Sequence, residues 1–174
     1  MIKERNIRHN TGRVQPPETG KMINGQARGS VAKMKYGICP MSFNGCEVIA
    51  VHNALVYLGK PRELADIAAY MESFRMLFGV FGCSPYKIGR ALKHFCVDFQ
   101  RTENPGDAGA FIVTFWTKHP FLSTIHTVFC IQGENGIEAY NYYNNSVGAE
   151  TFRDMEELAG KRRPIAVYTI KKQN

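Results

Sequence analysis

The spacing of apolar residues predicts helices in the first half of the chain. Apolar side chains recur at intervals of three and four residues over three segments, as they do along one face of an α-helix. Gly59 ends the first segment, Pro61 opens the second and Ser84 caps the third, in keeping with the helix-end preferences of these residue types. The predicted helices are residues 46–58, 61–72 and 84–95.

Beyond residue 96 the pattern changes to β-branched and aromatic runs separated by turn residues, which is typical of strands. The stretch "GENG" at residues 133–136 joins two of these runs as a hairpin. Thr151 and Asp154 form a capping pair for a short helix at residues 151–159. Helices followed by an antiparallel sheet predict an α+β fold. The predicted strands are residues 97–100, 110–116, 124–132, 137–143 and 164–170.

The charge of the chain lies almost entirely at its beginning. Residues 1–35 hold eight Lys or Arg and two Glu, which accounts for most of the net charge of +7. We therefore expect a basic, flexible arm at residues 1–33 and a single domain at residues 34–174. Such an arm can contact an acidic partner. Nucleic acid is a less favoured partner because no aromatic residue stands among these charges before Tyr36.

The cysteines and the hydropathy of the chain limit the cellular compartments and the kinds of site that we expect. The chain has five cysteines, an odd number, scattered and never in a CxxC pair, so neither a disulfide framework nor a metal site is expected. No cofactor is expected either, and a reduced, cytoplasmic setting is the simplest interpretation. No apolar run approaches the roughly 20 residues of a membrane span. The charged N-terminus lacks the apolar stretch of a signal peptide.

One cysteine stands where a loop meets an apolar helix. Cys46 follows Asn44 and Gly45 in the stretch "NGCEVIAVHNAL" at residues 44–55. A helix N-terminus offers unpaired N–H groups and the positive end of the helix dipole, and both favour a nucleophilic thiolate. Asn44 and the Cys46 N–H could donate to an oxyanion. A buried cysteine at the start of a core helix is an equally weighted alternative.

A thiol nucleophile needs a base, and the base needs an orienting acceptor. His126 stands in the apolar strand "IHTVFCI", where packing alone would place Val or Ile, although a core histidine is the alternative. Across the hairpin, His126 should lie opposite residues 140–143. Register favours Asn141 over Asn144 as the residue that orients the His126 ring. A strand-end turn is the other interpretation of this asparagine-rich stretch.

The order of a helix-start cysteine, a strand histidine and an asparagine on the next strand resembles the papain-like cysteine peptidases. Within that superfamily the chain is most similar to the bacteriocin-processing (double-glycine) peptidases, over residues 34–145. The resemblance implies that N-terminal helices carrying the cysteine pack on an antiparallel sheet carrying the histidine. It also implies a catalytic triad of Cys46, His126 and Asn141 in a thiol protease, which is a hydrolase acting as a peptidase or amidase on a peptide or protein.

Two positions depart from that family. Pro40 stands where the family places a glutamine that donates to the oxyanion, so Asn44 and Ser42 are the candidate substitutes. Glu47 stands where the family favours glycine, and a carboxylate beside a thiol opposes ionisation of the thiol. These departures favour the alternative function, a catalytically inactive papain-like domain that binds a peptide or partner protein. The sequence leaves the oligomeric state and the bond cleaved unknown.

Overall fold

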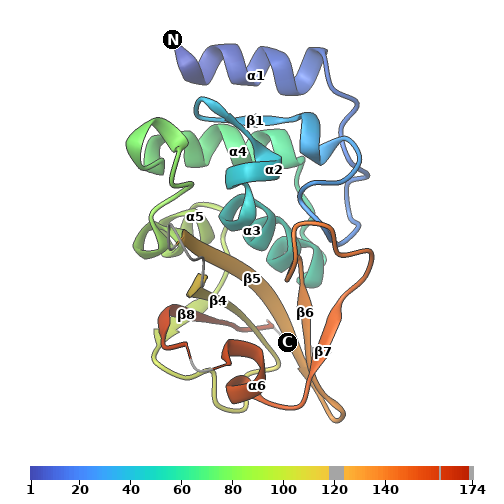
Figure 1. The fold of residues 1–174 in the computed structure, drawn as a ribbon, viewed down its shortest axis with the longest axis vertical. Coiled ribbons are helices and arrows are strands. Elements are labelled where there is room, and N and C mark those ends of the chain that lie inside the picture. Colours follow the sequence, from blue (N-terminus) through green and yellow to red (C-terminus); the bar gives the residue numbers. More distant parts are fainter. Residues whose placement is uncertain (118–123, 161, 173–174) are drawn as a thin grey trace.

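The computed structural model describes residues 1–117, 124–160 and 162–172. Its centre is one antiparallel sheet with helices on both faces (Figure 1). The strands of the sheet are β3 (Phe99–Thr102), β4 (Ala110–Thr117), β5 (Thr124–Gly133), β6 (Gly136–Tyr140), β7 (Glu150–Phe152) and β8 (Pro164–Ile170). Their order across the sheet is β3-β8-β4-β5-β6-β7, which places the two longest strands, β4 and β5, in the middle.

Most of the helices lie above one face of this sheet in Figure 1. The α-helices are α1 (Ile2–Gly12), α2 (Met41–Asn44), α3 (Cys46–Tyr57), α4 (Leu64–Met71), α5 (Ile88–His94) and α6 (Met155–Ala159). Four single turns of 3-10 helix add to them, η1 (Val31–Lys33), η2 (Glu72–Phe74), η3 (Leu77–Gly79) and η4 (Pro85–Lys87). A small hairpin of β1 (Lys35–Tyr36) and β2 (Cys39–Pro40) lies beneath α1. No helix in the described part of the chain is long and apolar enough to cross a membrane.

Helix α3 is the centre of the larger hydrophobic core. Every residue from Cys46 to Leu55 is buried, because α3 contacts β4 and β5 on one side and α4 and α5 on others. An α-helix that is apolar on most of its circumference must be enclosed in this way. The environment of Cys46 is therefore fixed by a helix that cannot move without opening the core.

The opposite face of the sheet is covered by α6. Alternate residues of β4, which are Phe111, Val113 and Phe115, face this side and form a second cluster with Leu158 of α6. Ala110 and Ile112, which alternate with them along β4, join the core around α3. The period of two that defines a strand thus divides β4 between two apolar layers.

The structure confirms the predicted α+β class and most of the predicted elements. The first helix, the hairpin at Gly133 and Gly136 and the final strand at Pro164–Ile170 occur as predicted. The predicted helix at residues 151–159 is wrong at its start, because Thr151 pairs with Glu138 in the sheet as part of β7. Asp154 is the cap, since its side chain accepts from the Glu157 N–H at 2.8 Å. The short helix therefore begins at Met155.

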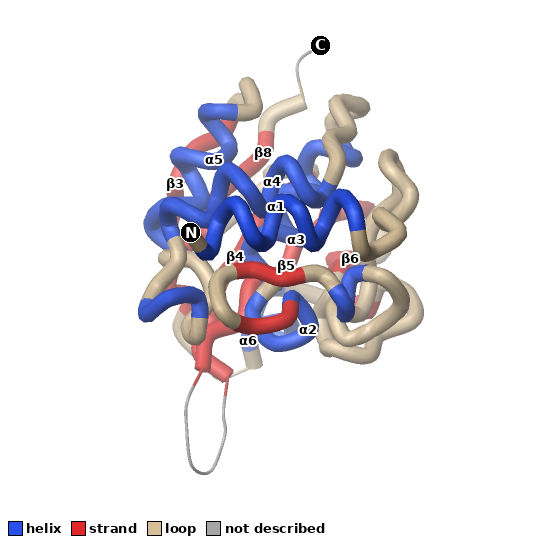
Figure 2. The backbone as a smooth tube through the Cα atoms, turned by 90° about the horizontal axis from the view of Figure 1, so that it is seen from above, coloured by secondary structure: helices blue, strands red, loops and turns tan. Residues whose placement is uncertain are grey.

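The N-terminal segment differs from the flexible arm expected. Helix α1 lies at the top of the molecule in Figure 1 and crosses the middle of the view from above in Figure 2, and it contacts α4 and β1. The Asn10 amide donates to the Lys35 carbonyl at 2.9 Å and accepts from the Lys35 N–H at 2.8 Å. Further along, the Asn53 side chain of α3 makes the same two-way pairing with the backbone of Ile23. Helix α1 is thus fastened by buried asparagines, while Val14, Ile23 and Val31 further along the segment join the main core.

We expect Asn10→Ala to lower the free energy of unfolding by about 1–3 kcal/mol, because two partly buried backbone groups of Lys35 lose their partner. The matched control is Thr11→Ala, whose exposed hydroxyl bonds only within α1, to the Ile7 carbonyl. Chemical denaturation of both variants measures the difference. Equal stability of Asn10→Ala and the parent protein would show that this contact does not hold α1 in solution.

Candidate active site

Cys46 begins α3 directly after a sharp turn. Residues of α2 lead into Gly45, where a side chain would collide with the Met41 carbonyl and the Met41 side chain, so only glycine fits. The turn directs the Cys46 thiol to the wall of a cavity, although the residue is only 5% exposed. The Cys46 backbone N–H lies in the first turn of α3, where N–H groups have no carbonyl partner within the same helix.

A buried carboxyl group lies against the thiol. Cys46 Sγ donates to Glu47 Oε2 at 3.3 Å, and Glu47 is fully buried. Burial raises the pKa of Glu47 to about 7. Burial, and next the charge of Glu47, raise the pKa of the Cys46 thiol well above its usual value. Near neutral pH the resting thiol is therefore protonated.

His126 lies on β5 with one ring nitrogen held by the backbone. Its Nε2 lies 2.7 Å from the carbonyl oxygen of Asn141, so this nitrogen carries the proton and donates. Nδ1 is then the unprotonated nitrogen and the one available to a thiol or a substrate. Burial lowers the pKa of His126, and the positive charge of Arg162 acts in the same direction. His126 is consequently a neutral base at neutral pH.

The Asn141 side chain has a different partner from the one expected. Its Oδ1 accepts from the Gln26 N–H at 2.8 Å and its Nδ2 donates to Gln26 Oε1 at 3.2 Å. The His126 ring is thus bonded to the backbone of Asn141, while the Asn141 amide fixes Gln26. The rival Asn144 also lines the cavity, and its carbonyl accepts from the Ala27 N–H at 2.8 Å.

Gln26 is the site residue that sequence reasoning missed. It is buried, it lines the same cavity as Cys46 and His126, and its Nε2 donates to the Ser42 carbonyl at 3.1 Å. The second hydrogen of this amide remains available to a ligand. Gly25 before it has a positive φ of 69° and lies against the Ser146 carbonyl. A glycine–glutamine pair inside a segment otherwise taken as a flexible arm was the only available signal.

The two residues expected to bind an oxyanion occupy other places. The Asn44 amide nitrogen donates to the Tyr36 and Gly79 carbonyls, and Asn44 is buried away from the cavity wall. Ser42 contributes its backbone carbonyl to Gln26. Gln26, rather than Asn44 or Ser42, therefore offers a side-chain donor at the cavity, and Asn44 and Ser42 support the loop around Cys46.

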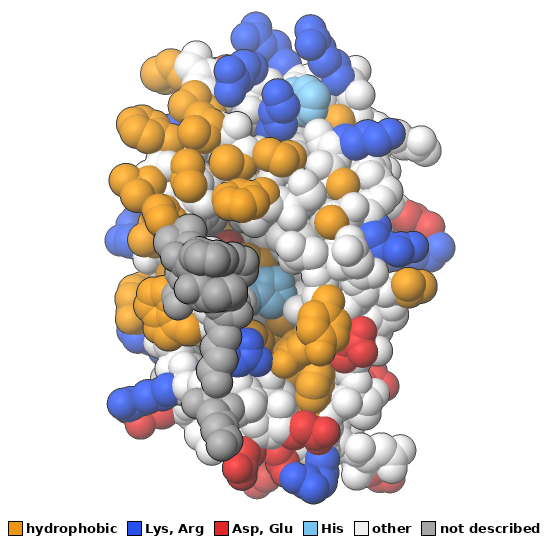
Figure 3. All heavy atoms as spheres, viewed as in Figure 1, with side chains coloured by type: hydrophobic (Ala, Val, Ile, Leu, Met, Phe, Trp, Pro, Cys, Tyr) orange, Lys and Arg blue, Asp and Glu red, His pale blue; other side chains and the backbone are white. Residues whose placement is uncertain are grey.

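The cavity has a volume of about 830 Å³ and combines these polar groups with aromatic walls. Figure 3 shows a histidine side chain at a hollow in the face of the molecule, with hydrophobic side chains around it. The apolar part of the lining is Phe43, Phe115, Ile125, Tyr142 and Tyr143. Within the described ranges no group of three or more His, Cys, Asp or Glu side chains could hold a metal ion. The cavity can therefore hold a ligand in which a polar group lies next to an apolar side chain.

Comparison of the chain with protein-family models, with curated proteins and with solved structures finds no match. The resemblance to papain-like peptidases therefore rests on the residues of this chain and on the geometry described above.

We expect Glu47→Gln to speed alkylation of Cys46 by iodoacetamide at pH 8, by roughly tenfold for each unit by which the thiol pKa falls. The wild-type carboxyl has a pKa of about 7, so it is charged at pH 8 and opposes formation of the thiolate. Mass-spectrometric mapping gives the rate at Cys46, with the exposed Cys96 as an internal reference.

The matched control for this experiment is Glu138→Gln on β6, an exposed carboxyl remote from the cavity lining. A thermal melt of both variants confirms that they are folded. Unchanged alkylation of Cys46 in Glu47→Gln would mean that the neighbouring carboxylate does not govern the thiol.

Proposed function

We propose that this protein is a papain-like thiol hydrolase that cleaves an amide or peptide bond. The observation that carries the proposal is the pairing of His126 Nε2 with the Asn141 carbonyl, in the wall of the cavity that Cys46 also lines. A base fixed at one nitrogen, with the other available beside a helix-start thiol, is the arrangement that nucleophilic catalysis by cysteine requires. A cysteine-bearing helix packed on a histidine-bearing sheet agrees with the papain-like resemblance.

In the first half of the reaction, Cys46 Sγ attacks the carbonyl carbon of the scissile amide. His126 Nδ1 takes the thiol proton and then gives it to the departing amine nitrogen as the C–N bond breaks. The product of this half is a thioester between Cys46 and the acyl group. In the second half, water loses a proton to His126 and attacks the thioester, which releases the acid and restores the thiol.

The negative charge that develops on the carbonyl oxygen needs two donors. The Cys46 N–H at the start of α3 is the first, and the free hydrogen of the Gln26 amide is the second. Gln26 is held on both sides, by Asn141 and by the Ser42 carbonyl, so its amide is oriented before substrate binds. Preorganised donors of this kind stabilise the transition state because they need no reorganisation during the reaction.

The chemistry of the cavity indicates a peptide or protein substrate with an apolar or aromatic residue near the cleaved bond. The aromatic walls favour burial of such a side chain, and the opening admits a larger chain. The cysteines in the described part of the chain are free, which agrees with a reducing compartment, and we propose the cytoplasm.

One observation favours the second candidate function, a catalytically inactive domain that binds a peptide. Cys46 gives its hydrogen bond to Glu47, and no hydrogen bond joins Cys46 to His126 in the described part of the structure. A thiol held in this way, with a raised pKa, is a weak nucleophile. The same cavity would then serve recognition alone.

The proposal is tested with an acyl probe that reacts only with active thiols and with a fluorogenic peptide library. We expect Cys46→Ala and His126→Ala each to abolish turnover, with no further loss in the double variant, because nucleophile and base act as one unit. Gln26→Ala should lower kcat by about 10²–10³. A folded wild-type protein that shows no adduct and no turnover, yet binds peptides from the library, would establish the inactive binding domain instead.

The role of Asn141 is separated into its backbone and its side chain by comparing Asn141→Gly with Asn141→Ala. Asn141 has a positive φ of 61°, which glycine adopts freely and alanine does not. We expect Asn141→Gly to keep the carbonyl bond to His126 and to lose only the support of Gln26, so its kcat should fall no further than that of Gln26→Ala. A complete loss of activity in Asn141→Gly, measured on the same substrate, would assign the orientation of His126 to the side chain.

A further inference from the structure

A cluster of large apolar side chains projects into solvent near the top of the molecule. Leu77 is 66% exposed, Phe78 is 65% exposed and Ile38 is 52% exposed. They come from η3 and from the turn between β1 and β2, and the Ile38 N–H donates to the Phe78 carbonyl at 3.0 Å. Isolated exposed apolar residues are common, whereas several joined in one place mark a contact surface.

The backbone that carries this cluster is in an unfavourable conformation. Leu77 has a φ of 44° and Phe78 a φ of 57°, in the left-handed region that residues other than Gly, Asn and Asp avoid. The turn is enforced by close packing of Gly37 against the Phe78 carbonyl and Gly79, where a side chain would collide. The fold therefore holds Leu77 and Phe78 outward in a backbone conformation that is costly for these residue types.

A row of positive charge lies next to this cluster. Arg5, Arg8 and Arg13 of the α1 segment line a cavity of about 430 Å³ together with His9 and Lys35. No described carboxylate lies within ion-pairing distance of these arginines or of Lys35. Like charges three or four residues apart on a helix destabilise it slightly. An anion bound across the row would remove that repulsion.

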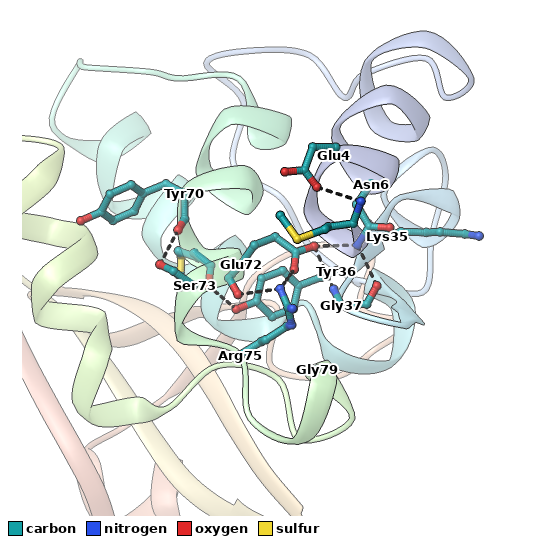
Figure 4. A network of polar contacts seen from close by, with 12 residues as sticks. Glu4, Asn6, Lys35, Tyr36, Gly37, Tyr70, Glu72, Ser73, Arg75 and Gly79 are labelled. Carbon is teal, nitrogen blue, oxygen red and sulfur yellow. Dashed lines mark hydrogen bonds and ion pairs between the residues drawn. The ribbon is translucent and has the colours of Figure 1, made fainter.

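The buried carboxylate of Glu72 contacts both the segment that carries the basic row and the segment that carries the apolar cluster (Figure 4). Glu72 Oε1 accepts from the Asn6 amide of α1 at 2.6 Å and from the Gly37 N–H at 3.0 Å. Glu72 Oε2 forms an ion pair with Arg75 at 2.7 Å, just before the loop of Leu77 and Phe78. Glu72 thus connects the basic helix, the hairpin that carries Ile38 and the apolar loop.

The apolar cluster and the basic row belong to one surface. Figure 3 shows Lys and Arg side chains over α1 at the top and hydrophobic side chains over the neighbouring segment at the upper left, where Figure 1 draws the chain after α4. Lys35 of the basic row and Ile38 of the apolar cluster belong to the same short hairpin. A single flat partner can therefore reach both.

We propose that this surface docks the protein on an anionic lipid membrane. The arginines of α1 and Lys35 would meet lipid phosphates, and Leu77, Phe78 and Ile38 would enter the boundary between headgroups and acyl chains. Interfacial proteins use this combination of basic and apolar residues, because one attraction alone gives only weak, reversible attachment. Nucleic acid would leave the apolar cluster unused, and an apolar peptide would leave the basic row unused. The inference is independent of the chemistry proposed for Cys46.

The test is co-sedimentation of the full chain with phosphatidylcholine vesicles, with and without phosphatidylserine. We expect binding only to the vesicles that contain phosphatidylserine, and weaker binding at high salt. Arg5→Gln and Arg8→Gln should each weaken binding roughly fivefold. The matched control is Lys93→Gln, at an exposed position of α5, which should leave binding unchanged.

The apolar contribution is tested with the double variant Leu77→Asn and Phe78→Asn, because asparagine tolerates the left-handed conformation and keeps the loop folded. We expect at least a tenfold loss of vesicle binding. Val147→Asn is the control, since Val147 is 82% exposed on a different loop. Three results would overturn the proposal: no vesicle binding, equal losses in test and control variants, or binding to a DNA duplex in place of vesicles that ignores the Leu77 and Phe78 changes.

Discussion

The left-handed backbone of Asn141 is the constraint on which the candidate site depends. The chain leaves β6 at Tyr140, and the positive φ of Asn141 turns its carbonyl toward His126 while its side chain points to Gln26. Its N–H in turn donates to the Asn24 side chain at 2.9 Å. A single residue thus holds the His126 ring, fixes the Gln26 amide and joins the sheet to the N-terminal segment. Asparagine suits all three tasks, because it tolerates this conformation and carries both a donor and an acceptor.

The consequence is that the geometry of the candidate site depends on how the N-terminal segment is attached to the domain. In sequence, Gln26 lies between Ile23, which pairs with Asn53 of α3, and Lys35, which pairs with Asn10 of α1. Each is a reciprocal pairing of a side-chain amide with the backbone, which fixes direction as well as position. Loosening the segment would release the amide of Gln26 from the cavity even if α3 and the sheet remained intact.

Elements with a strong apolar period could be predicted from the sequence, and elements held by polar contacts could not. Helix α3 and strand β8 have near-continuous apolar patterns, and counting back from the hairpin placed His126 near Asn141. Helix α1 buries asparagines instead of an apolar stripe, so its charge pattern predicted a flexible arm. The start of α6 was misplaced because Thr151 and Asp154 are both good caps, and pairing of Thr151 with β6 decides between them.

Glu47 is unfavourable both for the stability of the fold and for the proposed reactivity of Cys46. Its Oε1 is buried and finds no hydrogen-bond partner among the residues that the structure describes, which costs stability. Its Oε2 accepts the hydrogen bond of the Cys46 thiol. Glu47 lies outside the cavity lining, beside Gly82, while His126 forms part of the wall. In the structure the thiol bonds to Glu47, whereas in the proposed reaction only a proton passed to His126 can reach a leaving group in the cavity. The proposed hydrolysis would require Cys46 to exchange its Glu47 contact for one with His126. A substrate that excludes water from the cavity would favour this exchange, because His126 lines the cavity and Glu47 does not.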